Sequence, residues 1–312
     1  MLCLFFTGFV AYNQVTEKED KLKEIRLDSL DGWKKGGLTA LNISQVGLTN
    51  WAAGGQSSIA LNGIVSLYAN LKIGKSTWDN SLDLGYGILR QGSGMALRNG
   101  VFMKTDDKID LVSKYGRMAS EKWYYAGLIN FNTQSTPGYT YPNDSLVISR
   151  FMAPAYLLGA AGMDYKPNEF FTAFISPITM KMTFVNDDSL ADAGAYGVQQ
   201  AVYDDFGNLL TPGSKTRFEY GGYVRFSYKK TVMENITITS KLSLFSNYAN
   251  NPQNIDINWE NLIECKVNKY VSATLATHLI YDDDIDITDA DGNTGPRTQF
   301  KEVIGIGFSY KF

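Results

Sequence analysis

The chain contains a single histidine, His278, and this is the only side chain that could act as a histidine base. In its alternating stretch it falls on the same side as Ser272, and a tight turn before it would bring Asn258 or Glu260 across from it. A histidine, a carboxylate and a serine could together hydrolyse an ester or amide bond, but Ser309 is expected near the opposite rim. The sequence therefore favours an interior histidine over a catalytic one.

A second chemical candidate is the acidic stretch 282–293, which holds six aspartates. Closely spaced carboxylates are hard oxygen ligands of the kind that calcium prefers. The glycine of this stretch, Gly292, comes too early for the full calcium-loop pattern, so a solvated acidic turn is the favoured interpretation. We therefore expect no metal and no cofactor. If calcium did bind to this stretch, its candidate ligands would be Asp284, Asp286, Asp289 and Asp291.

The composition narrows the class of protein. The 312 residues carry 29 Lys and Arg against 32 Asp and Glu, a net charge of −3, and 13% of them are aromatic. So many aromatic and so few charged residues argue against disorder, and the lack of a basic excess gives no reason to expect nucleic acid. The longest weakly polar stretch after the N-terminus, 151–163, is shorter than the roughly 20 residues that a membrane-spanning helix needs.

From residue 38 onward, apolar side chains recur at every second position, which is the repeat of a β-strand. In the last segment Phe300, Ile304 and Ile306 share one face, while Lys301 and Gly305 share the other. The stretches 149–165 and 169–185 are apolar on both faces, so the pattern leaves their facing open. About twelve strands are predicted, near 38–48, 57–73, 76–90, 104–118, 121–133, 149–165, 169–185, 215–230, 233–248, 254–267, 270–281 and 298–312.

The connections between these strands alternate between short turns and longer loops. Short turns on one rim, long loops on the other and an even number of strands are typical of transmembrane β-barrels, whereas a soluble sandwich has no reason to separate them. We therefore predict an all-β protein, a single antiparallel barrel of about twelve strands in the bacterial outer membrane, with lipid on its apolar face. Aromatic residues near strand ends match the interfacial girdles of such barrels: Trp78, Trp123, Tyr125, Tyr165, Phe184, Tyr228, Tyr248, Trp259, Tyr281, Phe300, Tyr310 and Phe312.

The predicted inner faces carry charges of both signs. Opposite charges can pair across strands and close a narrow lumen, but about twelve strands lies between filled and open barrels, so the width of the lumen stays open. The long loops hold many more aspartates than cations, which predicts an acidic loop rim. The residues predicted to face the lumen are Asp79, Asp83, Arg217, Glu219, Arg225, Lys241, Glu260, Glu264 and His278.

Two segments precede the barrel, which is predicted to span residues 37–312. Residues 1–13 are apolar and have the character of a secretory signal peptide truncated at its start, because no positive residues come before the apolar run. Residues 14–36 are dense in charge and are predicted to form a periplasmic linker or a short helix.

The C-terminal run resembles the terminal signal of bacterial outer-membrane barrels, which implies recognition by the barrel-assembly machinery through Phe308, Tyr310 and Phe312. Other segments resemble a family of Gram-negative outer-membrane barrels catalogued as a domain of unknown function. They are 51–55, 106–111 with 114–116, 190–197 and 300–312. The resemblance supports the fold and the location over 33–312, and it implies no catalytic residue.

These observations favour a non-catalytic barrel that is structural or binds a partner, as an accessory subunit of an envelope assembly. The long loops, chiefly 186–214, would then provide the surface for protein partners. The main alternative is a narrow channel for small solutes, and the third is a hydrolase at the loop rim.

Overall fold

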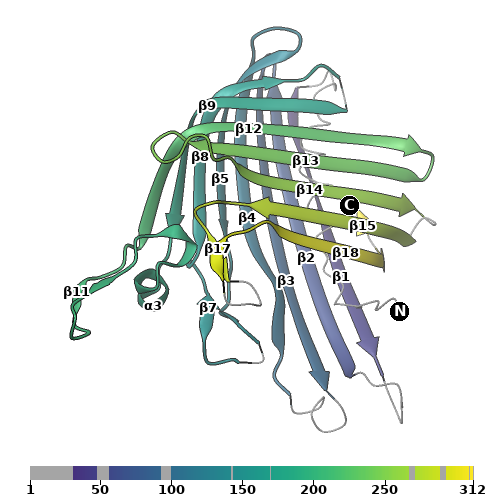
Figure 1. Cartoon of the computed structure of the whole chain (residues 1–312). Coiled ribbons are helices and arrows are strands. Elements are labelled where there is room, and N and C mark those ends of the chain that lie inside the picture. Colours follow the sequence, from purple (N-terminus) through teal and green to yellow (C-terminus); the bar gives the residue numbers. More distant parts are fainter. Residues whose placement is uncertain are drawn as a thin grey trace.

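The computed structural model describes residues 31–47, 56–92, 100–141, 143–168, 170–266, 271–288, 293–308 and 310–311. One curved sheet of long antiparallel strands makes up most of the molecule (Figure 1). Its strands are β1 (Gly32–Val46), β2 (Ser57–Ile73), β3 (Ser76–Gly92), β4 (Met103–Met118), β5 (Trp123–Thr133), β8 (Ala155–Tyr165), β9 (Phe171–Phe184), β12 (Thr216–Met233), β13 (Ile236–Asn247), β14 (Asp256–Lys266), β15 (Val271–Tyr281), β18 (Gln299–Phe308) and β19 (Tyr310–Lys311).

The sheet closes on itself. Its order is β18-β15-β14-β13-β12-β9-β8-β5-β4-β3-β2-β1-β19, and β18 and β19 are parts of the same final passage, with one residue between them. The first and last passages meet where Leu38 pairs with Lys311 and Thr39 pairs with Tyr310. The described residues therefore form an antiparallel barrel of twelve strand passages, which confirms the predicted fold class.

Alternation of side chains explains why these stretches form strands with two distinct faces. On β3, Asp79, Ser81 and Asp83 are buried inside, while Trp78 and Leu84 are 43% and 37% exposed on the outside. Successive side chains of a strand point to opposite faces, so the polar set and the apolar set separate without any further constraint. The same alternation settles the facing of β8 and β9, where Asp164 and Phe174 point inward.

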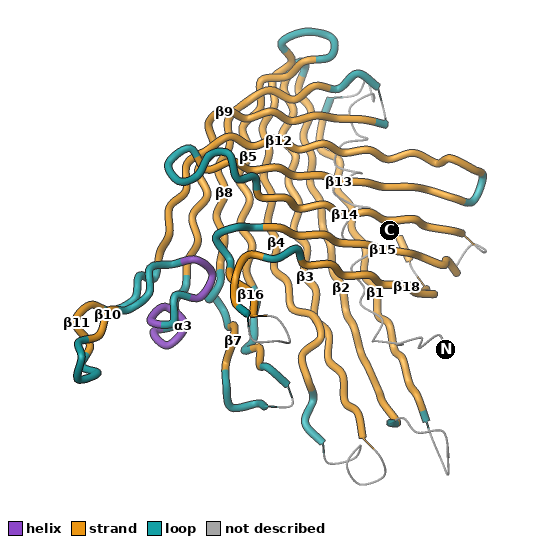
Figure 2. Tube along the Cα trace, viewed as in Figure 1, coloured by secondary structure: helices purple, strands orange, loops and turns teal. Residues whose placement is uncertain are grey.

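Short turns and long loops alternate along the chain as predicted. The turns 74–75, 119–122, 166–170 and 234–235 connect strands at one end, and long connections such as 134–154 and 185–215 join them at the other. The long loops contain the small elements β6 (Gly138–Tyr139), β7 (Val147–Ser149), α3 (Asp188–Asp192), η2 (Ala195–Gly197), β10 (Val202–Tyr203), β11 (Leu209–Thr211), β16 (Asp286–Thr288) and β17 (Thr294–Pro296). Figure 2 shows these elements gathered at a common end of the barrel.

Some predicted boundaries differ from the structure. The predicted strand 149–165 begins only at Ala155, because Pro154 has no backbone N–H to donate and Met152 has a φ of 59°. The turn expected near 231–232 lies at 234–235. Strand β1 begins at Gly32, so residues 32–36 of the expected linker are β-structure, while the expected signal peptide and residues 14–30 lie outside the described residues.

Candidate functional site: the lumen and the loop rim

A band of exposed apolar side chains surrounds the barrel. These residues lie on the faces opposite the buried polar ones, which is the arrangement that a hydrocarbon environment requires of a transmembrane strand. The side chains with a third or more of their surface exposed include Leu61, Leu67, Leu84, Leu111, Ile129, Ile175, Ile178 and Met180.

Aromatic side chains flank this band at both ends. At the turn end, the rings of Trp33 and Trp78 lie 5.9 Å apart, and Trp123 and Tyr165 lie 4.6 Å apart. At the loop end, Tyr220 and Tyr248 form an edge-to-face pair at 6.0 Å. Amphipathic rings of this kind favour the boundary between hydrocarbon and water, so the two groups mark the two membrane interfaces.

The inner face is largely polar, and many of its polar side chains are buried. Carboxylates and hydroxyls from β3, β4, β8, β9, β12 and β13 are exposed by 8% or less. Near the turn end, Asp164 pairs with Lys114 at 3.2 Å and with Lys166 at 2.8 Å. Buried charges are stable when they are paired, so these contacts cross-link the inner face near the turn end.

Lys181 is the centre of an ionic cluster at the loop end of the lumen. Its Nζ atom lies 3.4 Å from Glu219, 3.2 Å from Asp256 and 3.6 Å from Asp282. Arg217 pairs with Glu219 at 3.1 Å and also with Asp284. The cluster thus joins β9, β12 and β14 to the last long loop, and it holds the first residues of that loop against the barrel wall.

A cavity of about 540 Å³ lies beside this cluster. Its lining comes from β4, β5, β8, β9, β12, β13, β14, β15 and β18, and the loop residues Tyr196, Asp282 and Ile285 add to it. A single cavity that touches so many strands must lie in the lumen. Its charged lining residues are Lys108, Asp110, Lys181, Arg225, Lys241, Asp256, Glu260 and Asp282.

An apolar cluster borders the cavity inside the barrel. It consists of Ala126, Ala160, Phe174, Tyr223 and Phe245, which come from five successive strands of the sheet, β5, β8, β9, β12 and β13. The ring of Phe174 lies 6.3 Å from that of Tyr223, whose hydroxyl is 3.1 Å from the Ser243 hydroxyl. Because Tyr223 and Phe245 also line the cavity, one side of the cavity is aromatic.

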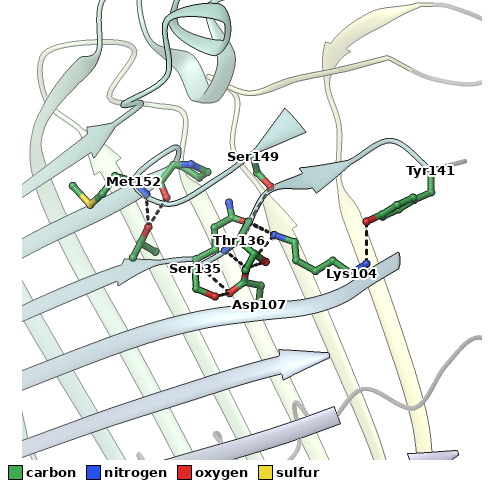
Figure 3. Close-up of polar contacts among 10 residues, drawn as sticks. Lys104, Asp107, Ser135, Thr136, Tyr141, Ser149 and Met152 are labelled. Atoms are coloured by element: carbon green, nitrogen blue, oxygen red, sulfur yellow. Dashed lines mark hydrogen bonds and ion pairs between the residues drawn. The ribbon is translucent and has the colours of Figure 1, made fainter. Parts of the chain in front are cut away.

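At the rim, the 134–154 loop is fastened to β4 by Asp107 (Figure 3). The carboxylate of Asp107 accepts hydrogen bonds from the backbone N–H groups of Ser135 and Thr136, at 2.8 and 2.7 Å, and from both of their hydroxyls. Lys104 pairs with the same carboxylate at 3.1 Å and donates to Gln134 and to the Thr136 carbonyl. This network fixes the start of the loop.

The base of the 185–215 loop is packed against the barrel end. Ala153, Val185, Leu190, Ala191 and Val198 form a buried apolar cluster there. Nearby, burial raises the pKa of the Tyr196 phenol to about 12, so this hydroxyl stays neutral and donates to the Ile148 carbonyl. The loop base is therefore a small folded unit on the rim.

Beyond this base, the β10–β11 hairpin projects away from the barrel (Figure 1). Phe206 at its tip is 91% exposed, and Leu210 and Tyr203 are 64% and 50% exposed. Asp204 shapes the tip, because its carboxylate accepts from the N–H groups of Phe206 and Asn208.

The residues predicted to face the lumen do not form a single site in the structure. Asp79, Asp83, Glu219 and Lys241 are buried inside, Arg217 joins the ionic cluster, and Arg225 and Glu260 line the cavity. The backbone register places Glu260 opposite His278, one of the two partners expected for it, with Lys301 on the other side. Glu264 pairs in register with Thr237 and Thr274.

The four calcium candidates are not assembled in the described residues. Asp284 is paired with Arg217, Asp286 belongs to β16, and Asp289 and Asp291 lie outside the described part of the chain. A different set, Asp256, Asp282 and Asp283, brings carboxylate oxygens within 4.8 Å of one another. The ammonium of Lys181 already contacts two of these carboxylates and balances part of their charge.

Sequence reasoning missed Lys181 and Asp256, which are the main members of the ionic cluster. Lys181 lies in a stretch that looks apolar on both faces, and Asp256 is the first residue of its strand. A lone lysine in an otherwise uncharged strand was the available signal, because an uncompensated charge there must find a partner.

The closed antiparallel sheet, the apolar outer band and the paired polar interior define a transmembrane β-barrel, and the chain is such a protein of the bacterial outer membrane. Residues 43–139 match the family described as "Protein of unknown function (DUF3078)". This confirms the expected resemblance to a domain-of-unknown-function family, and the match contains the segments 51–55 and 106–116. A comparison with curated proteins finds no match. No helix in the described residues is long and apolar enough to cross a membrane.

The chain is similar in fold to several solved structures. The translocator domain of the autotransporter NalP from Neisseria meningitidis is 10% identical, with a TM-score of 0.40, and the similarity covers 96% of this chain and 94% of that one. An outer membrane channel from Pseudomonas putida F1 is 12% identical, with a TM-score of 0.41 and coverages of 91% and 97%. The NanC porin is 8% identical, with a TM-score of 0.39 and coverages of 88% and 98%.

Proposed function

We propose that this protein is a non-catalytic binding barrel that does not conduct solutes and that contacts a protein partner of the cell envelope through its 185–215 loop. The observation that carries the proposal is the burial of charged side chains on the inner face. Glu219 and Asp83 are each 2% exposed and Lys241 is 3% exposed. An open aqueous pore would leave inner-face charges of this kind in contact with water.

Two features support a lumen that does not conduct. The apolar cluster around Phe174 and Phe245 lies along the inner wall formed by five successive strands, and an apolar stretch of the lumen opposes the passage of ions because water leaves it readily. The Lys181 cluster then braces the loop end with opposite charges.

The projecting hairpin supports a contact surface. Phe206, Leu210 and Tyr203 expose apolar area on an element that is not needed to close the barrel, and exposed apolar groups of this kind favour protein contacts. The tip also carries Asp204 and Asp205, so a partner with an apolar groove bordered by basic residues would fit it.

The C-terminal residues Phe308, Tyr310 and Phe312 are the proposed contact with the assembly machinery.

The register around the histidine supports a role without catalysis. The residues paired with His278 are Glu260 and Lys301, and neither is a nucleophile of the serine or cysteine type. A hydrolase needs nucleophile, base and orienting group within hydrogen-bond reach of one another.

The cavity favours one alternative, a narrow channel for small solutes, and planar bilayers distinguish the two functions. Wild-type protein should show no steady unitary conductance. A variant with Phe174→Ala and Phe245→Ala removes most of the apolar cluster and serves as the positive control for an opened lumen. Steady unitary conductance of the wild type would overturn the proposed function in favour of the channel.

The partner contact can be tested separately in intact cells. A photo-crosslinking residue at position 206 should give one adduct of constant mass. The same residue at position 253, in the exposed 248–255 loop, is the matched control and should give none. Equal labelling from both positions would show that the hairpin is not a specific contact surface.

A further inference from the structure

The charges that line the lumenal cavity are unevenly distributed along its depth. At the loop end, the cavity is lined by Asp256, Asp282 and Lys181, so carboxylates exceed cations by one. Deeper in the barrel, the cavity is lined by Arg225, Lys241 and Glu260, where cations exceed carboxylates by one.

The strand register fixes this order of depth. Asp256, the first residue of β14, pairs with Phe245, whereas Asn258 pairs with Ser243 and Glu260 pairs with Lys241. Arg225 pairs with Ser243, at the middle of these three levels. From the loop end inward, the cavity therefore passes from an acidic level to a basic one over about four residues of strand, or roughly 13 Å.

The remaining charged lining residues do not alter this polarity. Lys108 and Asp110 both come from β4 and pair with each other at 2.9 Å, so they add no net charge. A cavity with an acidic end and a basic end has a directed electric field, which favours a solute with both charges over a solute with only one. A net cation or a net anion would meet its own sign of charge at one end.

One wall of the cavity is apolar. Tyr223 and Phe245 line it together with Leu158, which packs against the same apolar cluster. The cavity volume of about 540 Å³ lies within the range of roughly 300–1,000 Å³ that is usual for small-molecule sites. Polar groups at both ends and an aromatic wall between them give a bound molecule one orientation.

We propose that the lumenal cavity binds a small zwitterion with an apolar side group, of the size of an amino acid or a dipeptide. Its ammonium group lies near Asp256 and Asp282, its carboxylate lies near Arg225 and Lys241, and its side group packs on Tyr223 and Phe245. This proposal rests on one part of the proposed function, namely that the barrel binds a ligand. It does not depend on the contact between the hairpin and a protein partner.

Three probes of nearly equal size test the proposal: L-phenylalanine, phenethylamine, which keeps only the ammonium group, and 3-phenylpropionate, which keeps only the carboxylate. Equilibrium dialysis against purified protein in detergent micelles, with empty micelles as the blank, measures their binding. L-phenylalanine should bind roughly tenfold more tightly than either analogue. Equal binding of all three, or no binding above the empty micelles, would overturn the proposal.

Two variants test the two ends separately. Arg225→Gln should weaken L-phenylalanine roughly tenfold and leave phenethylamine unchanged, and Asp256→Asn should weaken it similarly and leave 3-phenylpropionate unchanged. Lys215→Gln, at an exposed rim ion pair, is the matched control and should change nothing. If a variant fails to fold, the ranking of the three probes on wild-type protein still decides. Planar-bilayer conductance separately tests the proposed function, so the two failures are distinguishable.

Discussion

Lys181 on β9 and Asp256 on β14 form an ion pair at 3.2 Å, although two other strands lie between theirs in the sheet. The pair therefore reaches across the curved inner face of the barrel. Glu219 and Asp282 contact the same ammonium group, so one lysine links carboxylates from three parts of the chain.

Lys181→Met should strongly destabilise the barrel. The substitution keeps most of the side-chain volume but leaves three carboxylates without their shared cation, one of them, Glu219, only 2% exposed. Removing one partner of a buried ion pair costs about 3–5 kcal/mol. The measurement is the midpoint of denaturant unfolding in detergent micelles.

The matched control is Lys215→Met. Lys215 also pairs with a carboxylate, that of Asp188 at 2.6 Å, but the two side chains are 50% and 84% exposed. An exposed pair of this kind contributes little, so the unfolding midpoint should not move. Equal midpoints for Lys181→Met and the wild type would show that the cluster does not brace the lumen.

Gly162→Ala should destabilise the packing of β8 against β9. A Cβ atom at Gly162 would lie 2.0 Å from the Ile175 carbonyl oxygen, because the register between these strands shifts there and brings the backbones close. Relieving that contact requires a backbone movement, at a cost of about 1–3 kcal/mol.

Gly159 on the same strand provides the control for this change, since a Cβ atom there would meet nothing within 4 Å. Gly159→Ala should leave the unfolding midpoint unchanged or raise it slightly, while Gly162→Ala lowers it. Equal effects of the two substitutions would mean that the close approach at Gly162 does not limit the fold.

The strands could be predicted from the sequence because their cause is local. The alternation of Trp78, Asp79 and Leu84 follows from the pleat of one strand and needs no knowledge of its neighbours. In 149–165 there is no such alternation, and the predicted start of the strand was wrong. Pro154 and the positive φ of Met152 delay strand pairing until Ala155, but they leave the hydrophobicity of the stretch unchanged, so the sequence pattern does not reveal them.

The contacts inside the lumen could be predicted from the sequence only in part. The inward facing of Asp79 and Glu219 follows from alternation, but the ionic cluster depends on which strands curve toward each other. Lys181 and Asp256 are 75 residues apart and belong to strands that are not neighbours in the sheet. Such a contact depends on barrel curvature, which a strand-by-strand analysis does not contain.

Asp107→Ala should release the 134–154 loop and leave the barrel intact. The carboxylate accepts four hydrogen bonds from Ser135 and Thr136 and pairs with Lys104, and each hydrogen bond to a charged group contributes about 1.5–3 kcal/mol. The rate of protease cleavage within 134–154 should rise, measured on protein in proteoliposomes. Asp144→Ala removes an exposed carboxylate from the same loop and should leave that rate unchanged; a rise for both variants would contradict the anchoring role.

Asp204→Ala should loosen the tip of the β10–β11 hairpin. The carboxylate accepts from the Asn208 side chain and from the N–H groups of Phe206 and Asn208, at 2.8 to 2.9 Å. Faster amide hydrogen exchange at Phe206 and Asn208, measured by mass spectrometry, would report the loss. Asp205→Ala is the control, because the Asp205 carboxylate accepts no hydrogen bond within the described residues.

The pH dependence of the same turn follows from the sign of the pKa shift. Hydrogen bonds from the Asn208 side chain and from the backbone hold the pKa of Asp204 below its usual 3.8. A lowered pKa means that the carboxylate stabilises the turn at all pH values above the ordinary pKa and loses this effect only as the pH falls through the lowered one. Protection of Phe206 and Asn208 should therefore persist at pH 4.5 and disappear only below about pH 3.8. Loss of protection already between pH 4.5 and 5 would mean that the carboxylate does not hold the turn, and the Asp205→Ala variant should follow the wild-type profile.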